Sequence, residues 1–206
     1  MTSNRLILDL CGGTASWSKP YKDAGYEVIV VDPLAKEGAQ MTVREFLDNG
    51  GHLTDGAKVH GILAAPPCCD FALSGSQWWK AKDADGRTAA SVQVVRDCLE
   101  AVARFKPVWW ALENPMGRIE KLVPELGKPS LRFHPCDYGD RYTKRTQLWG
   151  KFRPPMFRPV EPVMFTGKDG KRGSWMWAKM GGGAKGKAIR SMTPPGFARA
   201  FFESNP

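Results

Sequence analysis

The sequence has no uninterrupted run of roughly 20 apolar residues, the length that a membrane-spanning helix needs. Its first residues, MTSNR, lack the basic and apolar regions of a secretory signal peptide. Its five cysteines are odd in number and include no CxxC pair, which argues against a disulfide framework and against a zinc site. We therefore expect a cytoplasmic protein without a metal ion and without contact to a membrane.

Positive charge is concentrated near the C-terminus. The formal net charge is +9, and residues 151–206 contribute +8 of it through 11 Lys and Arg against 3 Asp and Glu. Bulky side chains accompany these charges at 164–165, 175–177 and 201–202. Because cations pair with phosphates and aromatic rings stack on bases, this part of the chain predicts a nucleic-acid partner. A solvated basic tail is the alternative.

Short apolar runs bounded by turn residues predict an α/β protein. We expect strands at 6–10, 28–31, 59–65, 108–112, 131–133 and 146–149, and a short strand that leads into a helical turn within 41–47. We expect helices at 17–24, 88–105 and 198–203, and a long loop at 71–85. Since strands alternate with helices, the sheet should be mostly parallel and seven-stranded, with helices on both faces.

A strand, a glycine turn, a helix, a second strand and an acid follow one another between residues 6 and 32. The acid, Asp32, comes 19 residues after Gly13. Nucleotide-binding βαβ units place an acid about 20 residues after the turn, where it binds ribose hydroxyls. The turn has neither a complete GxGxxG motif nor a lysine, so a nucleoside cofactor without phosphates fits best. S-adenosylmethionine is the common ligand of that kind.

Two of the expected strands end in reactive side chains. The strand at 59–65 ends at a stiff Pro66-Pro67-Cys68 turn, and the strand at 108–112 ends at Glu113-Asn114. A thiolate adds to electron-poor carbon, and a carboxylic acid protonates or holds a ring nitrogen. Together they suit a pyrimidine, with the thiolate at C6, the acid at N3, and C5 left to attack a methyl sulfonium. A buried apolar cysteine and a structural glutamate are the alternatives.

These motifs resemble, in the same order, those of DNA C5-cytosine methyltransferases, especially the short forms found in bacteriophages. The matching segments are DLCGGTA at 9–15, PPC at 66–68, Glu113-Asn114, Tyr138-Gly139 followed by Lys144-Arg145, and SMTPP at 191–195. The resemblance implies a Rossmann-like class I S-adenosylmethionine-dependent methyltransferase fold. It also implies three parts: a catalytic domain at 1–150, a minimal DNA-contacting segment at 151–190, and a C-terminal motif at 191–206 that packs back on the catalytic domain.

The resemblance assigns roles to individual residues. Cys68 would be the nucleophile, Glu113 would bind and protonate N3, and Arg145, or in second place Lys144, would hold O2 of a cytosine flipped out of the DNA. The cofactor pocket would be lined by Leu10, Cys11, Gly12, Gly13, Thr14, Ala15, Asp32, Pro33, Val43, Pro67 and Ser191. DNA would be contacted by Phe71, Ser74, Gln77, Asn114, Lys144, Lys168, Lys171 and Arg172. We expect a monomer, in the cytoplasm of a bacterium or a phage-infected host.

The sequence also departs from the family pattern. Cys11 replaces a usual phenylalanine, Ala15 a glycine, and Cys69 a glutamine. These changes leave open a modified sulfonium donor such as carboxy-S-adenosylmethionine. Residues 151–190 stand where full-length members carry a target-recognition region, so we expect backbone-dominated DNA binding with little sequence specificity. A catalytically inactive DNA-binding protein is the non-enzymatic alternative. An amino-methyltransferase is disfavoured because Ala65 precedes the two prolines.

Overall fold

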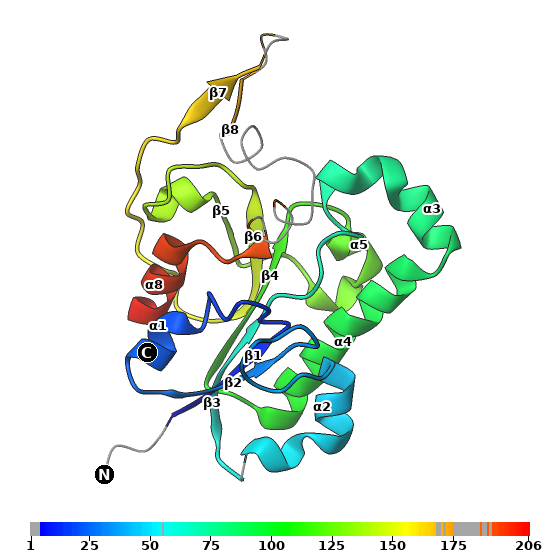
Figure 1. Ribbon diagram of the computed structural model, residues 1–206, viewed down its shortest axis with the longest axis vertical. Coiled ribbons are helices and arrows are strands. Elements are labelled where there is room, and N and C mark those ends of the chain that lie inside the picture. Colours follow the sequence, from blue (N-terminus) through cyan, green and yellow to red (C-terminus); the bar gives the residue numbers. More distant parts are fainter. Residues whose placement is uncertain are drawn as a thin grey trace.

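The computed structural model describes residues 5–54, 56–167, 170, 172–174, 186, 189 and 191–206. Within these residues, six strands form one sheet in the order β2-β1-β3-β4-β6-β5, and β7 and β8 pair as a separate hairpin (Figure 1). The strands are β1 (Leu6–Leu10), β2 (Glu27–Val31), β3 (Val59–Ala64), β4 (Trp109–Pro115), β5 (Leu131–Phe133), β6 (Thr146–Lys151), β7 (Met164–Thr166) and β8 (Arg172–Ser174). Neighbouring strands from β2 to β4 are parallel, and β6 runs antiparallel to both β4 and β5.

Helices cover both faces of the sheet (Figure 1). One face packs on α2 (Val43–Asn49), α4 (Arg87–Phe105) and α5 (Ile119–Leu122), and the other on α1 (Lys19–Asp23) and α8 (Pro195–Ser204). The remaining helical segments are α3 (Trp79–Ala84), η1 (Gly51–Thr54), η2 (Leu73–Trp78), η3 (Pro124–Leu126) and η4 (Pro135–Tyr138). The predicted α/β class, with helices on both faces of a largely parallel sheet, is thereby confirmed.

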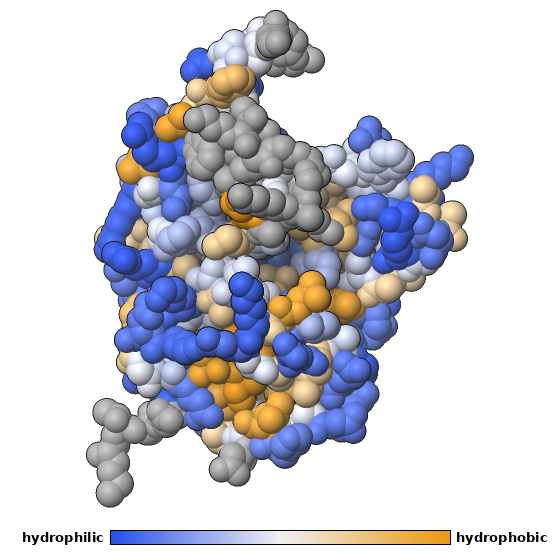
Figure 2. Space-filling model, in the orientation of Figure 1, coloured by the Kyte–Doolittle hydropathy of each residue, from blue (hydrophilic) through white to orange (hydrophobic). Residues whose placement is uncertain are grey.

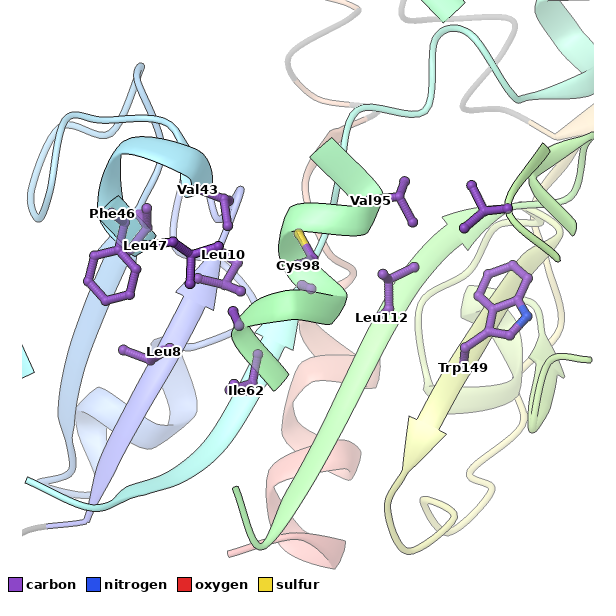
Figure 3. Packing of buried hydrophobic residues seen from close by; sticks show 14 of the residues in the cluster. Leu8, Leu10, Val43, Phe46, Leu47, Ile62, Val95, Cys98, Leu112 and Trp149 are labelled. Carbon is purple, nitrogen blue, oxygen red and sulfur yellow. The ribbon is translucent and has the colours of Figure 1, made fainter. Parts of the chain in front are cut away.

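Strand β1 serves both hydrophobic cores, because successive side chains of a strand point to opposite faces. Leu8 and Leu10 pack toward α2 and α4, in the cluster drawn in Figure 3. Ile7 packs on the other face, with Trp17 and Phe201. A strand that is buried on both faces is apolar almost throughout, so the polar exception, Asp9, stands out.

The short strand expected within 41–47 is wrong, because Thr42 caps helix α2, which begins at Val43; the helical turn expected after it lies in that helix. Thr42 Oγ1 accepts a hydrogen bond from the Glu45 N–H (3.1 Å), and Glu45 Oε2 accepts one from the Thr42 N–H (2.7 Å). This reciprocal capping box fixes a helix start, and its T-x-x-E pattern is legible in the sequence. The sheet of the described residues therefore has six strands rather than seven.

Two other expectations change in ways that affect the site. The segment expected as a loop at 71–85 contains η2 and α3. Strand β4 continues to Pro115, so Glu113 and Asn114 lie within a strand, opposite Leu148 and Gln147 of β6. No helix in the part of the chain that the structure describes is long and apolar enough to cross a membrane.

Candidate active site

Cys68 follows β3 on a turn that is held on both sides. On one side, the Pro66 carbonyl accepts a hydrogen bond from Asn114 Nδ2 (3.0 Å). On the other side, the Cys68 carbonyl accepts hydrogen bonds from the backbone N–H groups of Phe71 (3.1 Å) and Ala72 (2.9 Å). The side chain is half-buried. Burial raises the pKa of the Cys68 thiol, and the positive charge of Lys144 acts in the opposite direction.

Glu113 and Lys144 form an ion pair beside this thiol. Lys144 Nζ lies 3.6 Å from Glu113 Oε1, and the two side chains are only 13% and 15% exposed. Both charges act on the pKa of Cys68, Lys144 lowering it and Glu113 raising it. The structure thus brings together a thiol, a carboxylate and an ammonium group from three separate segments of the chain.

Arg145 faces elsewhere. Its side chain is exposed, and its Nη1 lies 4.0 Å from Met116 Sδ. It lines a pocket of about 210 Å³ that does not include Cys68 or Glu113. The other lining residues are Met116, Arg132, Phe133, His134, Asp137, Thr146 and Gln147. Of the two basic residues proposed to reach the base, Lys144 is therefore the one beside Glu113.

The glycine turn after β1 is tightly bent and joined to Asp32. Cys11, Gly13 and Ala15 adopt left-handed backbone angles, with φ of 56°, 49° and 55°. The Asp32 carboxylate accepts hydrogen bonds from the N–H of Gly13 (3.0 Å, to Oδ2) and of Leu34 (2.7 Å, to Oδ1). Asp32 therefore links the ends of β1 and β2 while each carboxylate oxygen keeps a lone pair for a ligand.

Asp9 lies fully buried beneath the same turn, and no role for it was predicted. Ser18 Oγ donates a hydrogen bond to Asp9 Oδ2 (2.5 Å). A Cβ atom at Gly12 would lie 2.6 Å from the Asp9 carboxyl carbon, so the turn packs directly on this group. Burial raises the pKa of Asp9 to about 7, and the nearby Asp32 adds to the increase. The sequence signal that could have identified Asp9 is a carboxylate inside an otherwise apolar strand.

The C-terminal segment contacts this turn. The Thr193 N–H donates a hydrogen bond to Ser16 Oγ (2.9 Å). Trp17 packs against Phe197 and Phe201 of α8, with ring centroids 5.8 and 5.5 Å apart. Segments from the two ends of the chain therefore form one wall beside the glycine turn.

The remaining predicted residues lie in varied surroundings. Leu10 and Val43 are buried in the core, whereas Thr14, Pro33, Pro67 and Ser191 are exposed. Phe71 is buried, and Ser74 and Gln77 are exposed on η2. Arg172 is exposed on β8, and Lys168 and Lys171 lie outside the described residues. No group of three or more His, Cys, Asp or Glu residues that could hold a metal ion occurs among the described residues.

Two known proteins that resemble this chain are both methyltransferases by name. No protein-family model matches the chain. It is 28% identical over 144 residues to the Type II methyltransferase M.AplI of Arthrospira platensis, covering 63% of this chain and 39% of that relative. A solved E. coli structure, named for a DNA modification methyltransferase encoded within a prophage, matches with a TM-score of 0.50 and 18% identity. That match covers 76% of this chain and 53% of the other, and it shows a shared fold. The chain spans about two fifths of the curated relative and about half of the structural neighbour.

Proposed function

We propose that this protein is an S-adenosylmethionine-dependent DNA methyltransferase that acts on C5 of cytosine. The observation that carries the proposal is the placement of Cys68 and Glu113 toward the carboxyl ends of the neighbouring parallel strands β3 and β4, with Lys144, from the segment before β6, beside them. Open α/β sheets bind their ligands at that edge. Both similar proteins are methyltransferases by name, and the name of the structural neighbour adds DNA modification, which supports methyl transfer to DNA.

The three side chains divide the chemistry of addition. Cys68, as the thiolate, forms a bond to C6 of a cytosine flipped out of the DNA stack. Glu113, in its acid form, gives its proton to N3, so that no negative charge accumulates on the ring. Lys144 stabilises the thiolate before addition and the Glu113 carboxylate after it. The ring is then rich in electrons at C5, which would take a methyl group from a bound sulfonium donor and leave that donor as a neutral thioether. Loss of the C5 proton to a base, return of the N3 proton to the Glu113 carboxylate and elimination of the Cys68 thiolate would complete the reaction.

The residues of the glycine turn fit a nucleoside cofactor. Both oxygens of Asp32 retain lone pairs that can accept ribose hydroxyls, and Leu34 beside it is 85% exposed, so its apolar side chain can pack on a base. The sharp bend around Gly13, which has no side chain, leaves the backbone there open to close approach. When bound, S-adenosylmethionine supplies the methyl group.

The proposal is tested by incubating the protein with double-stranded DNA and S-adenosylmethionine carrying a labelled methyl group, then identifying the labelled nucleoside. We expect label on C5 of cytosine. Cys68→Ser should abolish it, and Cys69→Ser, which changes the adjacent thiol, should retain it. Label on an exocyclic nitrogen overturns the proposal. So does the absence of both label and a covalent adduct on 5-fluorocytosine DNA. No label, together with a stable adduct on 5-fluorocytosine DNA that forms only when a modified sulfonium donor is supplied, would replace the proposed donor with that sulfonium.

DNA binding in this proposal depends chiefly on the phosphate backbone. The hairpin β7–β8 carries the exposed Arg172, and Lys168 and Lys171 neighbour it in the sequence. Phosphate contacts hold DNA without reading its bases, so we propose low sequence specificity. The basic C-terminal quarter supports this part of the proposal.

A further inference from the structure

A second carboxylate lies buried next to the Cys68 turn, and the proposed reaction does not use it. Asp70 is 4% exposed, although it is only two residues from Cys68. Its Oδ2 accepts a hydrogen bond from Ser91 Oγ of α4 (2.6 Å), and its Oδ1 lies 3.1 Å from Lys82 Nζ of α3. Burial acts to raise the pKa of Asp70, but the hydrogen bonds from Ser91, Lys82 and the Cys69 thiol together outweigh it and leave the pKa below its usual value. Asp70 therefore stays ionised in its buried place.

Lys82 also holds the backbone of the turn. Its Nζ, which is paired with Asp70, donates a hydrogen bond to the Cys69 carbonyl (2.5 Å). The ammonium group of Lys82 thus contacts both Cys69 and Asp70, the two residues that follow Cys68, and fixes the backbone between them. Because Pro66 is held from the other side by Asn114, the thiol lies between two anchored points.

Arg118 ties the same turn to the segment that follows Glu113. Its Nε donates to the Asp70 carbonyl (2.9 Å), and its backbone N–H donates to the Phe71 carbonyl (3.0 Å). A Cβ atom at Gly117 would lie 1.9 Å from the Phe71 carbonyl oxygen, so the two segments are in the closest contact that backbones allow. The spacing between the Cys68 turn and the strand of Glu113 is set here.

Polar contacts, rather than apolar packing, hold the segment that supplies Lys82. No residue of η2 or α3 is fully buried, and Figure 2 shows hydrophilic side chains around α3. The guanidinium of Arg118 bonds Asp83 (2.7 and 2.8 Å) and lies 4.6 Å from the ring centroid of Trp79. This segment is tied to the Cys68 turn by Lys82, through Asp70, and to Arg118 by Asp83.

We infer that Asp70 is a positioning residue for the Cys68 thiol: with Lys82 and Ser91 it fixes the turn from which the thiol approaches its substrate. Burying a carboxylate costs free energy that an apolar side chain would avoid. The Asp70–Lys82 pair therefore serves to fix the geometry of the turn more than to stabilise the fold. The inference rests on the proposed role of Cys68 as nucleophile. A displacement of about 1 Å at a reacting group can cost about 100-fold in rate.

The test compares Asp70→Ala, Asp70→Asn and Lys82→Met with two matched controls on the same segment. Asp85→Asn and Lys80→Met remove the same charges from exposed positions. Two quantities are measured for each variant. One is the rate at which iodoacetamide alkylates Cys68, resolved by peptide mass spectrometry from pH 6.5 to 9.5. The other is kcat and KM for methyl transfer to double-stranded DNA.

For Asp70→Ala and Lys82→Met we expect kcat to fall by about 100-fold with KM for DNA unchanged. Cys68 alkylation should become faster, because a loosened turn exposes the thiol, while the pH midpoint of alkylation stays in place. For Asp70→Asn we expect a kcat and an alkylation rate between those of the wild type and of Asp70→Ala, since its amide oxygen still accepts the Ser91 hydrogen bond. If Asp70→Ala does not fold, Lys82→Met decides.

Variants that match the controls in both measurements overturn the inference, as does a loss of thermal stability without faster alkylation. The two proposals fail separately. If the wild-type protein transfers no methyl group, the proposed function is wrong, whereas the alkylation rates still decide whether Asp70 positions Cys68.

Discussion

The ammonium group of Lys144 lies 3.6 Å from the Glu113 carboxylate, and both side chains are largely withdrawn from water. The two charges act on the Cys68 thiol with opposite signs, because Lys144 lowers its pKa and Glu113 raises it. Burial is the largest effect and raises the pKa of the thiol, so the charge of Lys144 is the influence that favours the thiolate.

Removing the Lys144 charge should therefore disable the site more than removing the charge of its neighbour. We expect Lys144→Met to raise the pKa of Cys68 and to lower the methyl-transfer rate by about 100- to 1,000-fold, as for the loss of one preorganised charge contact. The measurements are single-turnover methyl transfer and the pH midpoint of Cys68 alkylation. Arg145→Met, which removes an exposed cation one residue away, is the matched control. A larger loss in Arg145→Met would return the role to Arg145.

The pKa of Asp9 predicts an unusual dependence of stability on pH. Its pKa is raised from 3.8 to about 7 in the folded protein, so between these values the folded state binds a proton that the unfolded state releases. The free energy of unfolding should therefore fall as pH rises from 4 to 7, by about 4 kcal/mol from this group, and level off above pH 7.

Chemical unfolding of wild-type protein and Asp9→Asn between pH 4.5 and 8 measures this contribution. The asparagine variant keeps the size of the side chain and cannot titrate, so the difference between the two curves belongs to Asp9. The free energy of unfolding of the wild type, relative to that of Asp9→Asn, should fall between pH 4.5 and 7 and stay constant above pH 7. Parallel curves would mean that Asp9 is ionised throughout.

Several features of the site could be predicted from sequence because they depend on neighbouring residues. Pro66 and Pro67 end β3 and place Cys68 after it, and the apolar run before Glu113 places that carboxylate near the same edge of the sheet. The strand predicted at 41–47 failed although its signal is also local, because the capping pattern of Thr42 and Glu45 outweighs a short β-branched run.

Other features depend on contacts between distant residues. Arg118 meets Asp70 across 48 positions of the chain, and nothing in either local pattern indicates the pairing. The choice between Lys144 and Arg145 depends on which way an irregular segment turns, and alternation along a strand cannot supply it. Asp9 was visible as a carboxylate within an apolar strand, but its burial under Gly12 follows from the turn geometry.

Asp32 should affect cofactor binding in two ways, because its carboxylate holds the turn and remains able to accept hydroxyls. We expect Asp32→Asn to weaken binding of S-adenosylhomocysteine by at least about tenfold, since the amide keeps one acceptor oxygen of the two that bond Gly13 and Leu34. Isothermal titration calorimetry measures the affinity. Glu37→Gln, an exposed carboxylate paired with Lys22, is the control. Equal affinities for the two variants would place the cofactor away from this turn.

The basic C-terminal quarter predicts DNA binding that weakens steeply with salt. Each cation that neutralises a phosphate contributes about 0.9 to the slope of log K against log salt, so neutralising Lys168, Lys171 and Arg172 should reduce that slope by about 3. Fluorescence anisotropy with a labelled duplex between 50 and 300 mM salt, a range over which about six contacts would cost roughly 10³-fold or more in affinity, measures it. The control is the double variant Lys58→Ala with Lys106→Ala.

These two exposed residues lie beside the amino ends of β3 and β4, opposite the Cys68 edge, so replacing them should leave the slope unchanged. A slope that falls equally per charge in both variants would mean that DNA is attracted by net charge alone. Phosphate contacts near residues 168–172 would then have no part in holding the duplex over Cys68.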